Sequence, residues 1–238
     1  MIACDYDYYH ESLLLRGFLA YKDAPAVTQR PAVLIAHDWT GRNSFACQKA
    51  QWLAELGYVA FAVDMYGCAR NGVSVDEKMQ LMQPLIEDRA LLAARMLQAL
   101  DVVCQLPQVD NTRIGALGFC FGGLCVLDLA RSGAPIKAVV SCHGLLNKPE
   151  NVEDNPIKSQ VLVLHGYDDP MVRPADVSLF CDEMNARHAD WQVHLYGHTQ
   201  HAFTNPEAHD SQMGTVYNAL ANKRALQAVT NFFDEALG

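Results

Sequence analysis

The most informative segment of this 238-residue chain is Gly118-Phe119-Cys120-Phe121-Gly122-Gly123. It follows a short apolar run, 113–117, that predicts a buried strand, and it precedes a run, 124–130, that predicts a helix. A turn that leads directly from a strand into a helix is tight, so the residues two before and two after its centre must be small. Gly118 and Gly122 meet this requirement. The sequence therefore predicts that Cys120 lies at the apex of a strand-to-helix turn.

The position of Cys120 has two interpretations. In the first, the following helix directs unpaired N–H groups and the positive end of its dipole at the sulfur, which favours the thiolate and suits a nucleophile. In the second, Cys120 is a small apolar residue in a glycine-rich turn, because short glycine motifs recur by chance. The hexapeptide alone leaves both interpretations open.

The composition limits the class of protein. A chain of this length suits one large α/β domain and is short for two, so we expect a single domain over residues 1–238. Half of the residues are hydrophobic, yet no run approaches the ~20 apolar residues of a membrane span, and the N-terminus lacks a signal pattern. A net charge of −9 without a basic cluster argues against nucleic acid or an anionic membrane as a partner. We expect a soluble, cytoplasmic protein.

The cysteines and histidines do not predict a metal or another cofactor. The eight cysteines form no Cys-x-x-Cys pair, and in a reducing cytosol most of them are expected to be buried free thiols. His194, His198 and His201 are spaced by four and three residues, which would suit a metal site on a helix. However, residues 191–195 alternate like a strand that Gly197 ends, so His194 is expected to point outward.

Predicted strands and helices alternate along nearly the whole chain. This pattern argues for an α/β fold with a doubly wound, mostly parallel sheet flanked by helices, without a large cap domain. Strands are expected at 13–21 (a candidate for antiparallel pairing), 31–36, 58–63, 113–118, 136–141, 160–165 and 191–196. Helices are expected at 44–56, 76–106, 124–130, 174–188 and 215–237, and Pro84 is expected to kink or divide the second of them.

A cysteine nucleophile needs a base, and the base needs a group that orients it. In doubly wound sheets such groups follow the carboxyl ends of strands. Asp168 and Asp169 follow a predicted strand directly, although Asp-Asp-Pro is also a common turn sequence. His201 is the candidate base, with His198 second. The order of nucleophile, acid and histidine along the chain is the order of α/β-hydrolases.

The remaining site residues are expected from the neighbouring segments. The backbone N–H of Phe121, next after the nucleophile, should donate to an oxyanion, with a second N–H from the loop 37–41, for which we choose Trp39. Phe119, Phe203 and Tyr66, together with Trp39, are expected to line an apolar pocket for flat or aromatic substrates, with Arg70 as a further candidate.

Taken over residues 10–235, the chain resembles the dienelactone hydrolase family of α/β-hydrolases. Its Gly-x-Cys-x-Gly-Gly matches 118–123, His-Gly-x-x-Asp-x-x-Val matches 165–172, His-(Ala/Ser)-Phe matches 201–203, and the segment 64–66 looks like the family's Asp-Leu-Tyr. The resemblance implies a catalytic triad of Cys120, His201 and Asp169, with the acid at Asp169 rather than Asp168, and no cofactor.

Two features depart from the family pattern. Members that resemble the prototype carry a glutamate where this chain has Asp38, and there the carboxylate contacts the cysteine and takes part in forming the thiolate. Asp38 is one methylene shorter, so it either serves this activation or is a structural turn residue. The prototype also holds its substrate's carboxylate with arginines, whereas this chain has Thr204-Asn205 at one of these places and no arginine in 77–82; Arg70 and Arg89 flank that stretch.

The leading hypothesis is a cofactor-independent hydrolase of small esters or lactones, a carboxylesterase similar to carboxymethylenebutenolidase, with a cysteine nucleophile. An enzymatic alternative is a promiscuous arylesterase or phosphotriesterase, because a soft thiolate can also attack activated aryl esters or phosphorus. A non-enzymatic alternative is a thiol redox sensor on the same fold, and a plainly structural role is a third. The expected partner is a small molecule, and the sequence favours neither a monomer nor a homodimer.

Overall fold

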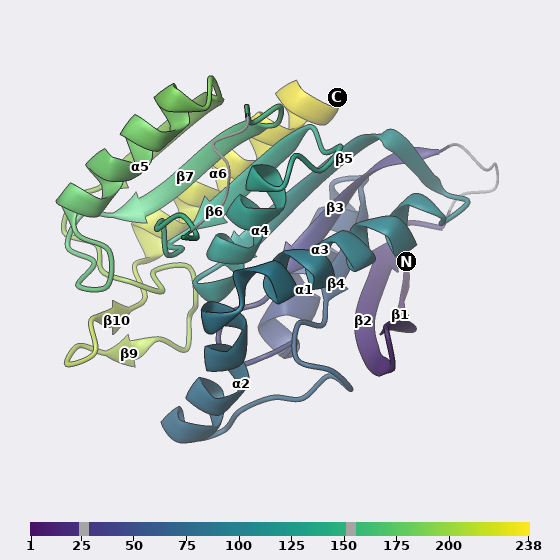
Figure 1. The fold of residues 1–238 in the computed structure, drawn as a ribbon, viewed down its shortest axis with the longest axis horizontal. Helices are drawn as coiled ribbons and strands as arrows, with labels where there is room; N and C mark the ends of the chain where they lie inside the picture. The colour runs from purple at the N-terminus through teal and green to yellow at the C-terminus, as the bar shows by residue number, and fades with distance from the viewer. Residues whose placement is uncertain (24–28, 151–155) are drawn as a thin grey trace.

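The centre of the fold is an eight-stranded sheet with the strand order β1-β2-β4-β3-β5-β6-β7-β8 (Figure 1). The computed structural model describes residues 1–23, 29–150 and 156–238. β1 and β2 are antiparallel to their neighbours, and the strands from β4 to β8 pair in parallel. The strands of this sheet are β1 (Ile2–His10), β2 (Leu13–Tyr21), β3 (Arg30–Ala36), β4 (Val59–Val63), β5 (Val109–Phe119), β6 (Ala138–Cys142), β7 (Gln160–Gly166) and β8 (Asp190–Tyr196).

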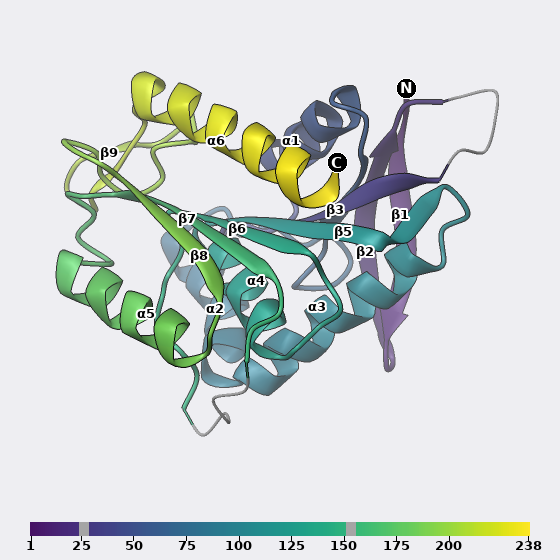
Figure 2. The same ribbon diagram turned by 90° about the horizontal axis from the view of Figure 1, so that it is seen from above.

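Helices cover both faces of the sheet (Figure 2). One face carries α1 (Ser44–Glu55) and α6 (Ala219–Leu237), and the other carries α2 (Val75–Glu87), α3 (Arg89–Cys104), α4 (Phe121–Arg131) and α5 (Pro174–Ala186). β3 explains this arrangement, because Val33 and Ile35 belong to the core cluster under α1 and α6, whereas Leu34 and Ala36 belong to the opposite cluster. Side chains alternate along a strand, so an uninterrupted apolar run fills both cores. The predicted doubly wound, mostly parallel sheet is confirmed.

Local capping sets the helix boundaries. Asn43 caps α1 by accepting the N–H of Ala46, whereas the sequence left either Asn43 or Ser44 as the cap. The long helix predicted at 76–106 is divided in two, but the break lies at Asp88 and Pro84 remains inside α2. The Asp88 side chain accepts the N–H of Leu91 and so starts α3. The division therefore comes from a new N-cap four residues beyond the proline.

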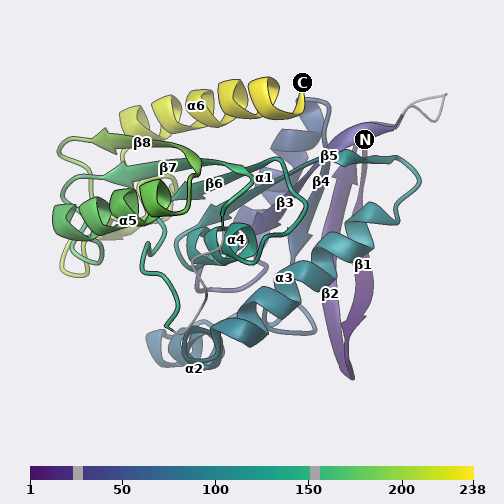
Figure 3. The same cartoon turned by 45° about the horizontal axis from the view of Figure 1, so that its top comes forward.

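Three strands were absent from the sequence-based prediction. β1 pairs with β2 at every position from Ile2↔Tyr21 to His10↔Leu13 and forms the end of the sheet opposite β8 (Figure 3). The short strands β9 (His209–Asp210) and β10 (Thr215–Val216) form a separate hairpin. Helix α6 therefore begins at Ala219, capped by Asn218, and not at 215 as predicted.

The parallel register brings the carboxyl ends of the central strands together. Gly118 in β5 pairs with Ala36 in β3 and with Ser141 in β6, and Cys142 pairs with Leu164 in β7. The loops that leave these ends carry residues 37–41, 120, 143 and 168–169. Within the described ranges, no helix is long and apolar enough to span a bilayer. The same ranges hold no group of three or more His, Cys, Asp or Glu side chains suited to a metal ion.

Candidate active site

Cys120 lies between the last residue of β5 and the first residue of α4. Its backbone has a φ of +54° and a ψ of −118°, a conformation that residues other than glycine rarely adopt and that stores about 1–3 kcal/mol of strain. The Cys120 N–H donates to the carbonyl of Cys142 at 3.0 Å, and the Cys120 carbonyl accepts the N–H of Gly123 at 2.9 Å. The strained apex is thus held from both sides. Strain that the surrounding backbone maintains in this way is typical of functional sites.

The flanking glycines are required by backbone contacts. A Cβ atom on Gly118 would lie 1.9 Å from the carbonyl oxygen of Gly122, and one on Gly122 would lie 2.1 Å from the carbonyl oxygen of Ala36. Neither neighbour can move aside, because both belong to the backbone of the turn or of β3. The size requirement inferred from the sequence is therefore met by direct backbone packing.

His201 and Asp169 form a buried pair. The Nδ1 atom of His201 lies 2.7 Å from Oδ2 of Asp169, and both residues are about 2% exposed or less. The other oxygen of Asp169 accepts the backbone N–H groups of Met171 and Val172, at 2.8 and 3.3 Å, so the carboxylate is oriented by its own turn. Because Nδ1 is engaged by Asp169, Nε2 is the nitrogen that His201 can offer to Cys120.

The pKa of His201 depends on both Cys120 and Asp169. Burial alone would lower the pKa of this histidine, but a negative charge at Cys120 and the hydrogen bond that Nδ1 donates to Asp169 raise the pKa to about 10. The structure therefore brings Cys120, His201 and Asp169 together. It separates them from the two alternatives of the sequence, since the His198 side chain is fully exposed and 3.9 Å from Asp168, which is itself about half-exposed.

The loop 37–41 after β3 is held by a histidine to which the sequence assigned no role. The Nδ1–H of His37 donates to the carbonyl of Asp38 at 2.6 Å, and its Nε2 accepts the N–H of Met65 at 3.2 Å. This pair of bonds requires a neutral ring, and burial lowers the pKa of His37 accordingly. The Asp38 carboxylate accepts the N–H of Thr40 at 2.8 Å, which is the contact of a turn residue. A role of Asp38 in activating Cys120 stays a prediction.

The two predicted oxyanion donors lie on either side of a tyrosine. Phe121 is the first residue of α4, so its N–H has no acceptor within the helix, and its ring stacks on Tyr66 with centres 5.9 Å apart. The Tyr66 hydroxyl donates to the carbonyl of Trp39 at 3.0 Å. Burial raises the pKa of Tyr66, so its hydroxyl stays protonated. Lys78 on α2 lies over the Trp39 ring, 5.2 Å from its centre.

The predicted pocket residues fall into two groups. Tyr66 stacks on Phe121 at the strand-to-helix turn, and its hydroxyl contacts Trp39. Phe119 and Phe203 are at most 1% exposed and belong to the core cluster under α1 and α6, where Phe119 packs against Phe45 at 5.1 Å. They support the site from behind the sheet. Arg70 is exposed and donates to the carbonyl of Tyr66.

Arg89 belongs to a buried ion network instead of the site. It contacts both oxygens of Asp128, at 2.5 and 2.8 Å, and Asp128 also pairs with Arg131 at 3.1 Å. Arg131 continues to Glu183 at 2.7 Å, and Glu183 lies 3.0 Å from Arg187. The network joins α3, α4 and α5.

One histidine of the site, His143, was not predicted from the sequence. His143 directly follows β6, and its ring centre lies 5.1 Å from that of His201. The rule that located Asp169, namely that site residues follow the carboxyl ends of strands, also applies to His143. No motif marks it, and this explains why the sequence did not reveal it.

Comparisons with known proteins identify relatives that cover most of this chain. Carboxymethylenebutenolidase from Pseudomonas putida is 26% identical over 223 residues, which are 88% of this chain and 89% of that protein. A probable 2-oxo-3-(5-oxofuran-2-ylidene)propanoate lactonase from Bradyrhizobium sp. is 29% identical over 201 residues, 78% of each chain. The solved structure of a dienelactone hydrolase-like promiscuous phosphotriesterase from metagenomic libraries has a TM-score of 0.94 at 35% identity and covers 100% of this chain and 99% of that chain.

The family is established by a match over almost the whole chain. The model of the dienelactone hydrolase family matches residues 15–237. This range contains Cys120, Asp169 and His201 in the order expected from the sequence. The mostly parallel sheet and its helical layers are those of the related structure above. The chain therefore belongs to the dienelactone hydrolase family of hydrolases and has the α/β-hydrolase fold.

Proposed function

We propose that the protein hydrolyses small esters or lactones with Cys120 as nucleophile, His201 as general base and acid, and Asp169 as the group that orients His201. The observation that carries this proposal is the buried His201–Asp169 pair, 2.7 Å apart, together with the strained backbone of Cys120 at the start of α4. The raised pKa of His201, to which a negative charge at Cys120 contributes, supports a thiolate–imidazolium pair. Family membership supports hydrolysis as the reaction.

In the acylation step, the Cys120 thiolate attacks the carbonyl carbon and forms a C–S bond, while the π electrons move onto the carbonyl oxygen. The N–H groups of Phe121 and Trp39 stabilise this oxyanion. When the tetrahedral intermediate collapses, the ester C–O bond breaks, and the His201 imidazolium donates its Nε2 proton to the departing alkoxide. The products are a thioester on Cys120, a free alcohol and a neutral His201.

In the deacylation step, neutral His201 takes a proton from a water molecule, which attacks the thioester carbonyl. The C–S bond then breaks, the carboxylic acid leaves, and the thiolate–imidazolium pair is restored. Asp169 stabilises the imidazolium and keeps Nδ1 protonated throughout. The two steps together consume one water molecule and return Cys120 and His201 to their starting charges.

The first test compares the wild type with Cys120→Ala and His201→Ala. The substrates are an aryl acetate and an aryl-substituted lactone, and the rate of product formation is followed by absorbance. We expect hydrolysis by the wild type and a loss of at least about 1,000-fold in both variants. His198→Ala is the matched control, because its side chain is fully exposed, and it should keep wild-type turnover. Full activity of Cys120→Ala would contradict the proposed mechanism.

A second candidate activity is the hydrolysis of phosphotriesters. It is favoured by the 35% identity and TM-score of 0.94 to a structure described as a promiscuous phosphotriesterase. The thiolate would attack phosphorus and expel an aryloxide, and water would then release the phosphodiester from sulfur. A nitrophenyl phosphotriester tests this activity, which should disappear together with ester hydrolysis in Cys120→Ala. Turnover of the phosphotriester that survives in this variant would assign it to another site or a contaminant.

A further inference from the structure

The end of β6 contacts both members of the proposed catalytic pair. The carbonyl of Cys142 accepts the N–H of Cys120 at 3.0 Å. The next residue, His143, places its ring edge-to-face against His201, with ring centres 5.1 Å apart and planes at 66°. Two consecutive residues therefore support the backbone of the nucleophile and the side chain of the base.

His143 is held firmly in this place. Its φ of +40° lies in the left-handed region, and its N–H donates to the carbonyl of Leu164 at 2.8 Å. Its Nε2 lies 2.7 Å from Oγ1 of Thr204, a fully buried residue that follows His201 by three positions. The ring also packs edge-to-face on Phe203 at 5.2 Å. The loop that carries His201 is thus tied to the end of β6.

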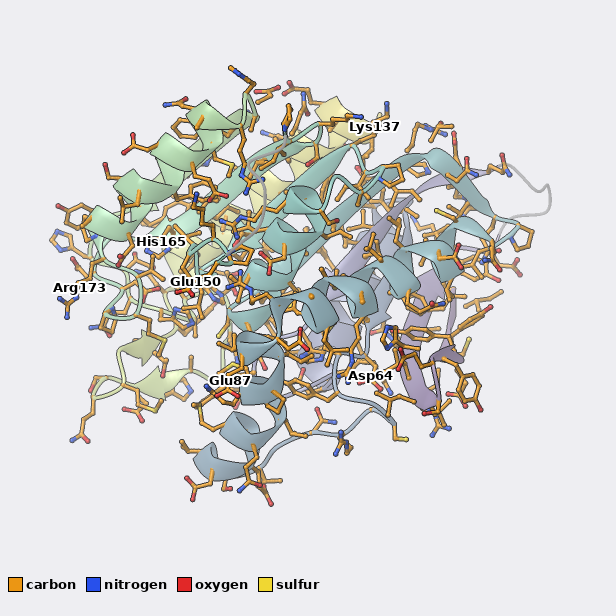
Figure 4. All side chains as sticks on the ribbon, in the orientation of Figure 1. Asp64, Glu87, Lys137, Glu150, His165 and Arg173 are labelled. Atoms are coloured by element: carbon orange, nitrogen blue, oxygen red, sulfur yellow. The ribbon has the colours of Figure 1, made fainter. Side chains whose placement is uncertain are left out.

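The His143 ring is neutral under the conditions in which His201 is charged. The residue is 2% exposed, and its burial, together with the positive charge of His201, lowers its pKa well below the usual range. Burial also lowers the pKa of the neighbouring His165 on β7, which is labelled in Figure 4. A neutral ring edge can lie against an imidazolium without charge repulsion. Its Nδ1 is buried and has no hydrogen-bond partner among the described residues, which is unfavourable and calls for a functional explanation.

We propose that His143 is a positioning residue, which keeps the His201 imidazole aligned between Asp169 and Cys120 by ring contact while its own orientation is set by Thr204. The inference rests on the proposed function and deepens it. His143 touches neither the nucleophile nor the reacting atoms of the substrate in this assignment, and it acts only through His201.

The acyl-enzyme is the state that needs this contact most. Before acylation, the Cys120 thiolate attracts the His201 imidazolium, so electrostatics help to hold the ring. Once the thioester has formed, both charges are gone, and the hydrogen bond between Nδ1 and Asp169 permits the ring to swing about that bond. The His143 ring occupies the space beside His201 and limits this motion. Loss of His143 should therefore slow deacylation more than acylation.

The test uses stopped-flow hydrolysis of a nitrophenyl acetate by the full-length protein, where the burst reports acylation and the steady state reports deacylation. We expect His143→Ala to slow deacylation by about 10- to 100-fold, as misplacement of a catalytic group does, with a smaller effect on the burst and on KM. His143→Phe restores the ring and should recover most of the rate. Thr204→Val keeps the ring but removes its hydrogen-bond partner, and it should give an intermediate loss.

The matched control is Phe233→Leu, which perturbs the buried core beside Gly115 and Tyr58 without touching the site. It should lower stability and leave both kinetic phases unchanged. Equal losses of acylation and deacylation in His143→Ala that His143→Phe does not restore would overturn the proposal. If His143→Ala does not fold, Thr204→Val decides, because wild-type deacylation in that variant would overturn the proposal as well.

A second measurement separates this proposal from the proposed function. An imidazole NMR titration follows His201 in Cys120→Ala, where no thiolate holds the ring, and in the double variants Cys120→Ala/His143→Ala and Cys120→Ala/Phe233→Leu. A misaligned ring weakens the hydrogen bond to Asp169, which raises the pKa of His201, so this pKa should fall on adding His143→Ala and stay unchanged on adding Phe233→Leu. This result supports positioning even if no ester is turned over. An unchanged pKa in the folded Cys120→Ala/His143→Ala variant overturns positioning even if the hydrolase chemistry is correct.

Discussion

At the scale of single residues, charge partners decide the protonation of the buried histidines. Burial lowers the pKa of His37 and of His143, and both rings make hydrogen bonds that suit the neutral form. His201 is equally buried, yet its pKa is raised to about 10, because a negative charge at Cys120 and the hydrogen bond to Asp169 outweigh burial. Two aspartates also raise the pKa of His37, but there burial has the larger effect. The buried histidines at the carboxyl edge of one sheet thus differ in charge according to whether their anionic neighbours outweigh burial.

This contrast makes the His201 proton a probe of Cys120. In Cys120→Ala the thiolate charge, the largest of the influences that raise the pKa, is absent, while the lowering effect of burial remains. We therefore expect the pKa of His201 to fall from about 10, as followed by imidazole NMR. Cys125→Ala is the control, because this thiol lies one turn further along α4 and is not among the groups that act on His201. A titration still near 10 in Cys120→Ala would disprove the coupling.

The adjacent aspartates should respond differently to the same substitution. Asp169→Asn keeps the shape of the carboxylate but favours the wrong tautomer of His201, so kcat for an aryl ester should fall, by up to about 10,000-fold. Asp168→Asn alters a half-exposed side chain and should leave kcat within about twofold. Initial rates of the two purified variants provide the measurement, and similar rates would show that the assignment of the acid to Asp169 is wrong.

At the scale of elements, the strand-to-helix turn is the part with the least tolerance. Gly122 packs against the carbonyl of Ala36 in β3, and Gly118 packs against Gly122 itself. These contacts join β3, β5 and α4 at the point where Cys120 takes its strained conformation. The backbone geometry of Cys120 is therefore a property of three elements together.

A single methyl group should disrupt this turn. In Gly122→Ala the new Cβ would lie 2.1 Å from a backbone oxygen, so we expect a loss of more than about 3 kcal/mol in the free energy of unfolding. Gly197→Ala is the matched control, since its Cβ meets no atom within 4 Å, and the change should stay within about 0.5 kcal/mol. Denaturant titration compares the two, and equal stabilities would show that the turn can relax.

At the scale of the whole molecule, a buried ion network connects three helices on one face of the sheet. The side chains of Asp128 and Arg131 are at most 3% exposed, and Arg131 also donates to the carbonyl of Leu146 at 2.8 Å. Glu183 on α5 completes the connection to α4. Charges removed from water in this way are costly to leave unpaired.

Removal of Arg131 should therefore destabilise the entire fold. Arg131→Met leaves Asp128 and Glu183 without this partner, and the free energy of unfolding should fall by about 3–5 kcal/mol in a denaturant titration. Arg16→Met provides the control, because Arg16 and Asp7 are each more than 40% exposed, and such pairs contribute at most about 1 kcal/mol. A loss of similar size in both variants would show that burial does not increase the contribution of an ion pair to the stability of this protein.

The sequence predicted what depends on local pattern. The parallel strands are continuous apolar runs because both of their faces are covered. The strand-to-helix turn at Cys120 is marked by glycines because its backbone contacts exclude a Cβ atom. β1 was missed because only a few of its side chains are buried; Tyr8 packs on Phe61, whereas Tyr9 is 60% exposed. Its pairing with β2 is a backbone interaction that leaves little trace in side-chain type.

The amino-acid sequence by itself determined the doubly wound sheet, the tight turn at Cys120 and the order of the candidate acid and histidine, because these depend on residue size, periodicity and position after a strand. Only the tertiary structure decided that the His201–Asp169 pair is buried, that Arg89 pairs with Asp128, and that His143 lies against His201. These outcomes depend on which loops the parallel register brings together and on which side chains it removes from water. Distance and burial of this kind arise from packing between segments far apart in the chain.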